Sequence, residues 1–199
     1  MGHSSNPASR KPPKWLSKTT VRRMDRAAYQ AYSDSHRGEF IALPVGSGFA
    51  FARCRDSIHF SFYDFHAPDI RPIEEIRHHP ILFTLCCSSR HLAKGLWQVI
   101  GQQPLEPALT KSPRCVDHVH GSDFIRIYYD GKFWPYAGED LTKLEPCAVW
   151  DNPDQVEDRL RLHFIGRPYP WSERQKVPLE FAERLYREYW AKHGGDGKS

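Results

Sequence analysis

The chain has 199 residues, of which 40% are hydrophobic, 26% charged and 13% aromatic. This length suits one domain with helical additions, and the aromatic residues are numerous enough to build a buried core. No stretch approaches the roughly 18 apolar residues of a membrane-spanning helix, and the polar residues 1–13 do not resemble a secretory signal. Five cysteines, an odd number, do not indicate a disulfide framework. We therefore expect a cytoplasmic protein that makes no contact with membranes.

The net charge of +4 is distributed unevenly along the chain. Residues 1–26 contain seven Lys or Arg and one Asp, whereas the rest contains 21 basic and 23 acidic residues. A basic arm of this kind is either a solvated tail or an element that binds nucleic acid or anionic lipid. Because basic tails are common and mostly unspecific, the arm alone does not indicate a nucleic-acid-binding protein.

The first third of the chain predicts a basic tail, a helix and an antiparallel meander. Residues 1–15 have a composition typical of disorder, and the spacing of apolar residues over 16–32 predicts a helix. In the last run of the meander, apolar residues alternate with His59, Ser61 and Tyr63, so we expect one buried face and one wetter face. The predicted strands are the aromatic-rich runs 40–44, 49–53 and 58–63, with turn residues between them.

The middle of the chain mixes helices and strands. Pro72 and the acidic residues after it predict a short helix through residue 78. We expect a central strand over 81–87, a short helix over 88–95, a strand over 97–100 and a looser stretch over 102–122. Asp130-Gly131, between strands expected over 124–129 and 133–137, is the strongest hairpin signal in the chain.

Helical spacing returns near the C-terminus. After an extended segment over 148–150, Asn152 and Pro153 are typical of the first positions of a helix, which Gly166 would end. A last helix begins after Pro178, with a tail over 194–199 that we expect to be disordered. Its predicted buried face consists of Leu179, Ala182, Leu185, Tyr186 and Tyr189. Together these elements predict one α+β domain over 16–193, in which a curled, mostly antiparallel sheet is surrounded by peripheral helices and flanked by N- and C-terminal helices.

No catalytic residues, metal ligands or cofactor site are predicted. Cys115, His118 and His120 surround Asp117, but structural zinc sites use two paired clusters and only one is present. Cys86 and Cys87 are neighbours in an apolar strand and point to opposite faces, so we interpret them as buried structural thiols. The chain also lacks a Gly-x-Ser-x-Gly elbow, a phosphate loop and a dinucleotide fingerprint. No small-molecule substrate is evident.

Aromatic and acidic residues gather in three predicted loops. Such residues suit a protein partner with a basic surface, because aromatic side chains act as anchors and charge complementarity steers the encounter. Alternatively, the aromatic residues belong to the core and the acidic residues cap helices. The candidate partner-binding residues are Asp64, His66, Asp69, Trp134, Tyr136, Glu139, Asp140 and Asp151.

Several short motifs follow one another in a distinctive order along the chain. They are Gly38 to Pro44, Phe49 to Arg53, Phe62 to Asp64, Ile81 to Phe83, and Gly95 to Gly101 followed by Pro104-Leu105. This order resembles the immunity protein 26 family of bacterial polymorphic toxin systems. The resemblance covers residues 38–165 and leaves the basic helix and the final helix outside. It implies a cytoplasmic protein, not an enzyme, that binds and neutralises a cognate toxin effector. It brings no catalytic residues, and we interpret its motif residues Gly38, Pro44, Trp97 and Gly101 as structural.

Two other functions stay open at this point. The basic arm would repel a basic nuclease toxin at low salt, and it also suits a nucleic-acid-associated regulator. A small hydrolase that reverses toxin damage would need a clustered acid and base, which the sequence does not reveal.

Overall fold

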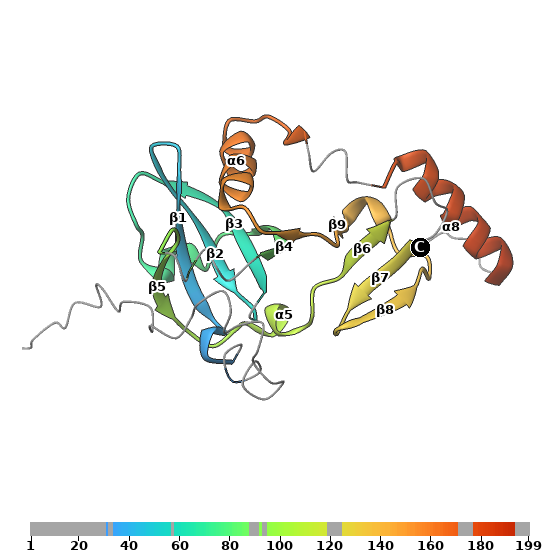
Figure 1. Ribbon diagram of the computed structural model, residues 1–199, viewed down its shortest axis with the longest axis horizontal. Helices are drawn as coiled ribbons and strands as arrows, with labels where there is room; N and C mark the ends of the chain where they lie inside the picture. The colour runs from blue at the N-terminus through green and yellow to red at the C-terminus, as the bar shows by residue number, and fades with distance from the viewer. Residues whose placement is uncertain are drawn as a thin grey trace, which may run out of the picture.

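The computed structural model describes residues 31, 34–56, 58–87, 92, 95–118, 125–170 and 177–193. Their strands form two sheets, which lie at opposite ends of the molecule (Figure 1). The first sheet has the order β10-β4-β3-β2-β1-β5, with β1 (Glu39–Val45), β2 (Gly48–Cys54), β3 (His59–Ala67), β4 (Ile81–Cys87), β5 (Gln98–Gln102) and β10 (Val149–Trp150). The second has the order β8-β7-β6-β9, with β6 (Cys115–His118), β7 (Ile125–Tyr129), β8 (Lys132–Pro135) and β9 (Glu145–Pro146). Neighbouring strands are antiparallel except β10 beside β4 and β9 beside β6.

Two longer helices lie near the C-terminal end of the described chain. One packs on the first sheet and the other on the second (Figure 1). They are α6 (Pro153–Phe164) and α8 (Leu179–His193), and the short helices are α3 (Ile73–Ile76), α5 (Pro107–Thr110) and η1 (Leu141–Lys143). Within the described residues, none of the helices combines the length and the apolar character needed to cross a membrane.

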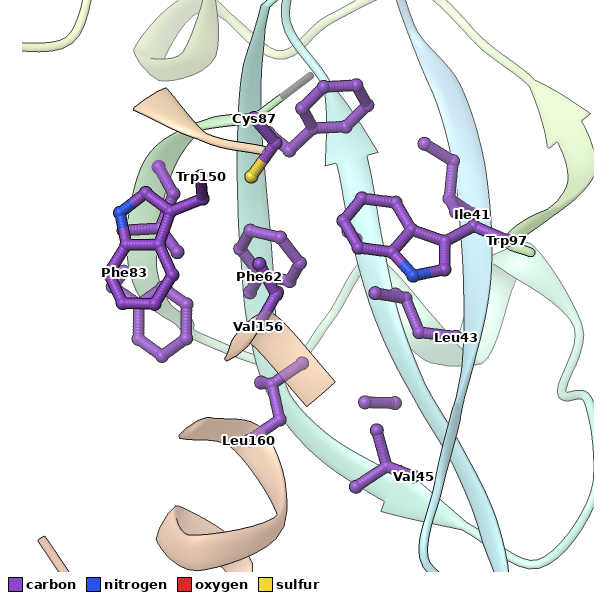
Figure 2. Packing of buried hydrophobic residues seen from close by; sticks show 14 of the residues in the cluster. Ile41, Leu43, Val45, Phe62, Phe83, Cys87, Trp97, Trp150, Val156 and Leu160 are labelled. Atoms are coloured by element: carbon purple, nitrogen blue, oxygen red, sulfur yellow. The ribbon is translucent and has the colours of Figure 1, made fainter. Parts of the chain in front are cut away.

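Both faces of the first sheet are covered. On one face, Val156 and Leu160 of α6 point toward Phe62, and Trp150 lies beside Phe83 (Figure 2). On the other face, Ile76 of α3 belongs to a second buried cluster. That cluster also contains Phe40, Ala42, Phe51, Tyr63 and Ala67.

Because both faces of the sheet are covered, the expectation that one face of the third strand is exposed to solvent is wrong. His59, Ser61 and Tyr63 are all buried. The Ser61 hydroxyl lies 2.8 Å from the Thr84 hydroxyl of the neighbouring strand, and His59 Nδ1 lies 2.8 Å from Asp56 Oδ2 in the turn before β3. The alternation in this strand therefore separates two buried clusters and not core from solvent.

The α+β class is confirmed, but the single curled sheet is wrong because the strands divide into two sheets. The division occurs where the chain leaves β5. The segment that follows contains Pro104, Pro107 and Pro113, and proline has no N–H to donate to a strand ladder. A new sheet therefore begins at β6, within the stretch that the sequence had predicted to be loose.

Several local predictions are confirmed. The meander and the Asp130-Gly131 hairpin are present. The Asn152 side chain caps α6 by accepting a hydrogen bond from Asp154 N at 3.1 Å. The prediction for Leu179 is wrong, since its side chain is 60% exposed at the start of α8. The predictions for the tails 1–15 and 194–199, and all but a few residues of the helices predicted over 16–32 and 88–95, lie outside the described residues.

Among the described residues, two segments lead from a strand of one sheet to a strand of the other, and buried arginines hold the first of them. Arg53 donates to the carbonyl oxygens of Gln103 (2.8 Å) and Pro104 (2.7 Å). Arg55 donates to the carbonyls of Leu109, at 3.0 Å, and Lys111. Because both guanidinium groups come from the end of β2, the crossing segment 103–114 is tied to the first sheet. The second crossing is the short link between β9 and β10, at residues 147–148.

Candidate protein-binding site

The hairpin β7–β8 presents the most exposed aromatic side chains of the second sheet. Its turn residues Asp130 (φ 55°) and Gly131 (φ 70°) both have left-handed backbone conformations, as a two-residue hairpin turn requires. All four residues of β8 are exposed. Phe133 is 47% and Trp134 42% exposed. Since successive strand residues point to opposite faces, the two rings lie on opposite sides of this edge strand.

Each exposed ring is held by a neighbouring aromatic ring of β7. The Trp134 ring stacks on Tyr129 with 5.5 Å between the ring centroids, and the Arg114 guanidinium lies 5.0 Å from the centroid of the Tyr129 ring. On the other face, Phe133 lies 5.1 Å from Tyr128, and Arg126 covers Phe133 at 4.1 Å. Such contacts limit the rotamer freedom that a partner would otherwise have to freeze on binding.

The acidic residues beside the hairpin are paired with bases of the same chain. Glu139 accepts a hydrogen bond from Ala137 N at 3.0 Å and lies 3.1 Å from Arg114 Nη2. Asp140 caps η1 by accepting from Thr142 N at 3.1 Å, and its other oxygen lies 3.0 Å from Lys143 Nζ. Hydrogen bonds from Thr142 and Lys143 lower the pKa of Asp140. The charge around β8 is thus largely balanced within the protein, and its exposed aromatic rings remain as the distinctive feature.

Tyr136 faces inward from the same loop. Its ring lies 5.9 Å from Tyr189 of α8, and its buried hydroxyl has no hydrogen-bond partner in the part of the chain that the structure describes. Burial, reinforced by the nearby Glu139 carboxylate, raises the pKa of Tyr136 to about 12. This tyrosine packs the loop against α8 more than it faces solvent.

The other predicted residues lie on or beside the first sheet. Asp64 Oδ1 is 2.8 Å from His163 Nε2. His66 Nε2 is 3.0 Å from the Val45 carbonyl oxygen, and its ring lies 5.2 Å from Phe164. Asp69, beyond β3, and Asp151, before α6, are both exposed. The structure therefore brings together Trp134, Tyr136, Glu139 and Asp140 and places the other four elsewhere.

Phe133, Arg114 and Arg126 were missed by the sequence reasoning. The signal for Phe133 was its place in a predicted hairpin strand, where alternation sets it opposite Trp134. Nothing local to Arg114 or Arg126 indicates the ring that each one covers, because those contacts depend on strand register. Arg126 also forms an ion pair with Asp117.

The cysteine and histidine cluster at β6 is divided by the strand. The Cys115 sulfur lies 3.9 Å from the Tyr128 carbonyl oxygen on one face, whereas the His118 ring contacts Phe181 of α8 on the other. His120 lies outside the described residues, among which no group of three or more His, Cys, Asp or Glu side chains is arranged to hold a metal ion. The interpretation of Cys86 and Cys87 as buried is correct for Cys87 only, since Cys86 is half-buried.

No protein-family model, curated protein or solved structure matches the chain. The resemblance to the immunity protein 26 family therefore rests on the order of motifs in the sequence. Two of those motif residues lie in environments that fit a structural role: Trp97 is 2% exposed in the core, and Gly38 has a left-handed backbone with φ 84°.

Proposed function

We propose that this chain is a cytoplasmic immunity protein that neutralises a cognate bacterial toxin effector by stoichiometric binding and without catalysis. The observation that carries the proposal is β8, an edge strand whose two aromatic side chains are both exposed and both held in place by neighbouring side chains, Trp134 by the stacked Tyr129 ring and Phe133 by Tyr128 and Arg126. Binding hot spots are typically rigid aromatic and arginine side chains. The motif order of residues 38–165 adds the expectation that the partner is a toxin.

Recognition at this surface uses side chains and not strand addition. β8 is short, begins with Lys132 and ends with Pro135, and both residues discourage the pairing of a further strand. An interface that places Phe133 and Trp134 in pockets of the partner, with the ion pairs of Glu139 and Asp140 at its rim, needs about 1,200–2,000 Å² of total buried surface. Since rim pairs contribute little and are screened by salt, the aromatic contacts would give a complex that survives high salt.

The test is a pull-down with the full-length tagged chain from the bacterium that encodes it, washed at low and then high salt. The expected result is one stoichiometric protein that is retained at high salt, inhibits growth when expressed alone, and is neutralised by co-expression of this chain. Co-purification of nucleic acid that is released by salt, without a protein partner, would overturn the proposal. That outcome would favour the regulator acting through the basic arm.

A further inference from the structure

The two sheets have separate hydrophobic cores in the part of the chain that the structure describes. The buried cluster of the second sheet shares no residue with the two clusters of the first. It joins β6 and β7 to η1 and α8, so that these elements, with β8 and β9, form one unit at one end of the molecule (Figure 1). We call this unit, residues 115–118, 125–146 and 177–193, the second lobe. Its cluster consists of Val116, Ile125, Ile127, Leu141, Val177 and Ala182.

The strands of the second lobe are less buried than those of the first sheet. Every residue of β2 except Phe49 is buried, because that strand is covered on both faces. In β7, which lies between β8 and β6, only Ile125 and Ile127 are buried, and all of β8 is exposed. The free energy that keeps a segment folded grows with the apolar area that it buries. The second lobe is therefore the less stable of the two parts.

At the first crossing, two neighbouring residues are attached to different sheets. The Lys111 carbonyl accepts a hydrogen bond from Arg55, at the end of β2 in the first sheet. The Ser112 hydroxyl accepts from Asp130 N, in the β7–β8 turn of the second sheet, at 2.9 Å. The boundary of the second lobe therefore lies between residues 111 and 112 on this segment.

At the second crossing, Ala148 alone separates residues attached to different sheets. The Cys147 N–H donates to the Val116 carbonyl oxygen of β6 at 2.7 Å, whereas Val149 pairs with Cys86 of β4. Opening the second lobe at this point and after residue 111 breaks none of the pairings that join β1, β2 and β3. It does break the ion pair between α6 and β9, whose closest atoms are 2.6 Å apart.

We propose that the second lobe unfolds and refolds as one unit while the first sheet stays folded, with Lys111 and Ala148 at the limits of the opening. Local unfolding of this kind takes place in contiguous cooperative units, and a separate core defines such a unit here. The candidate binding strand β8 belongs to the second lobe. A toxin bound to β8 would hold the lobe closed, and that consequence rests on the proposed function. The opening itself does not, since it is measured on the chain alone.

The test is hydrogen–deuterium exchange of the full-length chain, followed by mass spectrometry of peptic peptides at several low urea concentrations. We expect peptides from β7 and from the middle of α8 to converge on one exchange rate as urea is added. That rate should be at least about tenfold faster than the rate of β2 and β3. Exchange of β7 that is as slow as that of β2 contradicts the proposal. Separate rates for β7 and α8 at every urea concentration contradict it as well, because the lobe would then not open as one unit.

A matched pair of substitutions separates local opening from unfolding of the whole chain. Ile127 of the second lobe and Ile41 of the first sheet are both 0% exposed, and valine shortens either side chain by one carbon. Ile127→Val is expected to speed exchange in β7 about fivefold. Ile41→Val is expected to speed exchange in β2 by a similar factor and to leave the rate of β7 unchanged. If Ile41→Val also speeds exchange in β7, the two sheets open together and the proposal fails.

Discussion

Arg159 of α6 and Glu145 of β9 form a two-pronged ion pair that joins the helix of the first sheet to a strand of the second. Nη2 lies 2.6 Å from Oε1, and Nη1 lies 2.9 Å from Oε2. The same guanidinium stacks over the Phe83 ring at 3.9 Å. The side chains are only 10% and 22% exposed, so water screens the pair weakly.

Replacing Arg159 by alanine is expected to lower the free energy of unfolding by about 3 kcal/mol, because the substitution leaves the shielded Glu145 carboxylate without its partner. Urea denaturation measures the change. The matched control is Arg161→Ala on the same helix, whose pair with Asp158 is about half exposed and should contribute less than about 1 kcal/mol. Equal losses in the two variants would show that the Arg159 pair does not hold the sheets together.

Gly38 is the second place where one residue holds distant segments. Its N–H donates to the Cys54 carbonyl at 2.8 Å, and its own carbonyl accepts from Gln103 N at 3.0 Å. A Cβ at Gly38 would lie 2.1 Å from the Gln103 carbonyl oxygen, whereas a Cβ at Gly46 would meet nothing within 4 Å. Both glycines have left-handed φ values, 84° and 60°.

The comparison of Gly38→Ala with Gly46→Ala separates backbone strain from close packing. Both variants are expected to lose about 1 kcal/mol from the left-handed conformation. Gly38→Ala is expected to lose at least about 2 kcal/mol more, because the carbonyl of Gln103 has to move and Arg53 holds that same carbonyl. Thermal melts of both variants give the comparison, and similar midpoints would contradict the clash.

Local signals in the sequence predicted local structure. Asp130-Gly131 predicted its hairpin because two consecutive positive φ values favour these residue types, and Asn152 predicted the start of α6 because its side chain caps a free N–H. The division into two sheets was not predictable in this way. It depends on β9 and β10, two-residue strands whose parallel partners β6 and β4 lie far away in the sequence.

The residues of the candidate binding surface also depend on contacts between segments that are distant in the sequence. Trp134 was predicted as an exposed anchor from its neighbours, although it lies in a strand and not in a loop. The contacts of Trp134 with Tyr129, and of Tyr129 with Arg114, depend on the register of the strands, which cannot be read from the sequence.

Glu157 provides a test by pH. Its carboxylate accepts a hydrogen bond from Trp97 Nε1 at 3.0 Å, and burial raises its pKa above the ordinary value despite that bond. The folded state therefore binds a proton more tightly than the unfolded state at this site. Its contribution to stability is present below the ordinary carboxyl pKa and is lost as the pH rises through the raised one.

Glu157→Gln keeps an acceptor for Trp97 and removes the charge. We expect the variant to gain stability relative to the unmodified chain as the pH rises above about 4, with a difference that becomes constant once Glu157 is fully ionised. Calorimetric midpoints between pH 4 and pH 8 measure this. A difference that does not change with pH would show that the carboxylate is not destabilised by burial.

Trp134 and Asp140 separate binding from stability within the proposed interface. Trp134→Ala removes a half-exposed ring, so we expect affinity for the toxin to fall about 30-fold, the loss of a 2 kcal/mol hot spot, with little change in the melting midpoint. Asp140→Ala removes the cap of η1 and should cost about 1 kcal/mol of stability. We expect affinity for the toxin to change little, because the Asp140 carboxylate is already bonded to Thr142 and Lys143. Calorimetric titration with the toxin from the pull-down measures the affinity of each variant, and thermal melts measure its stability. If Trp134→Ala loses stability and affinity together, Trp134 is a structural residue and the binding surface lies elsewhere on the chain.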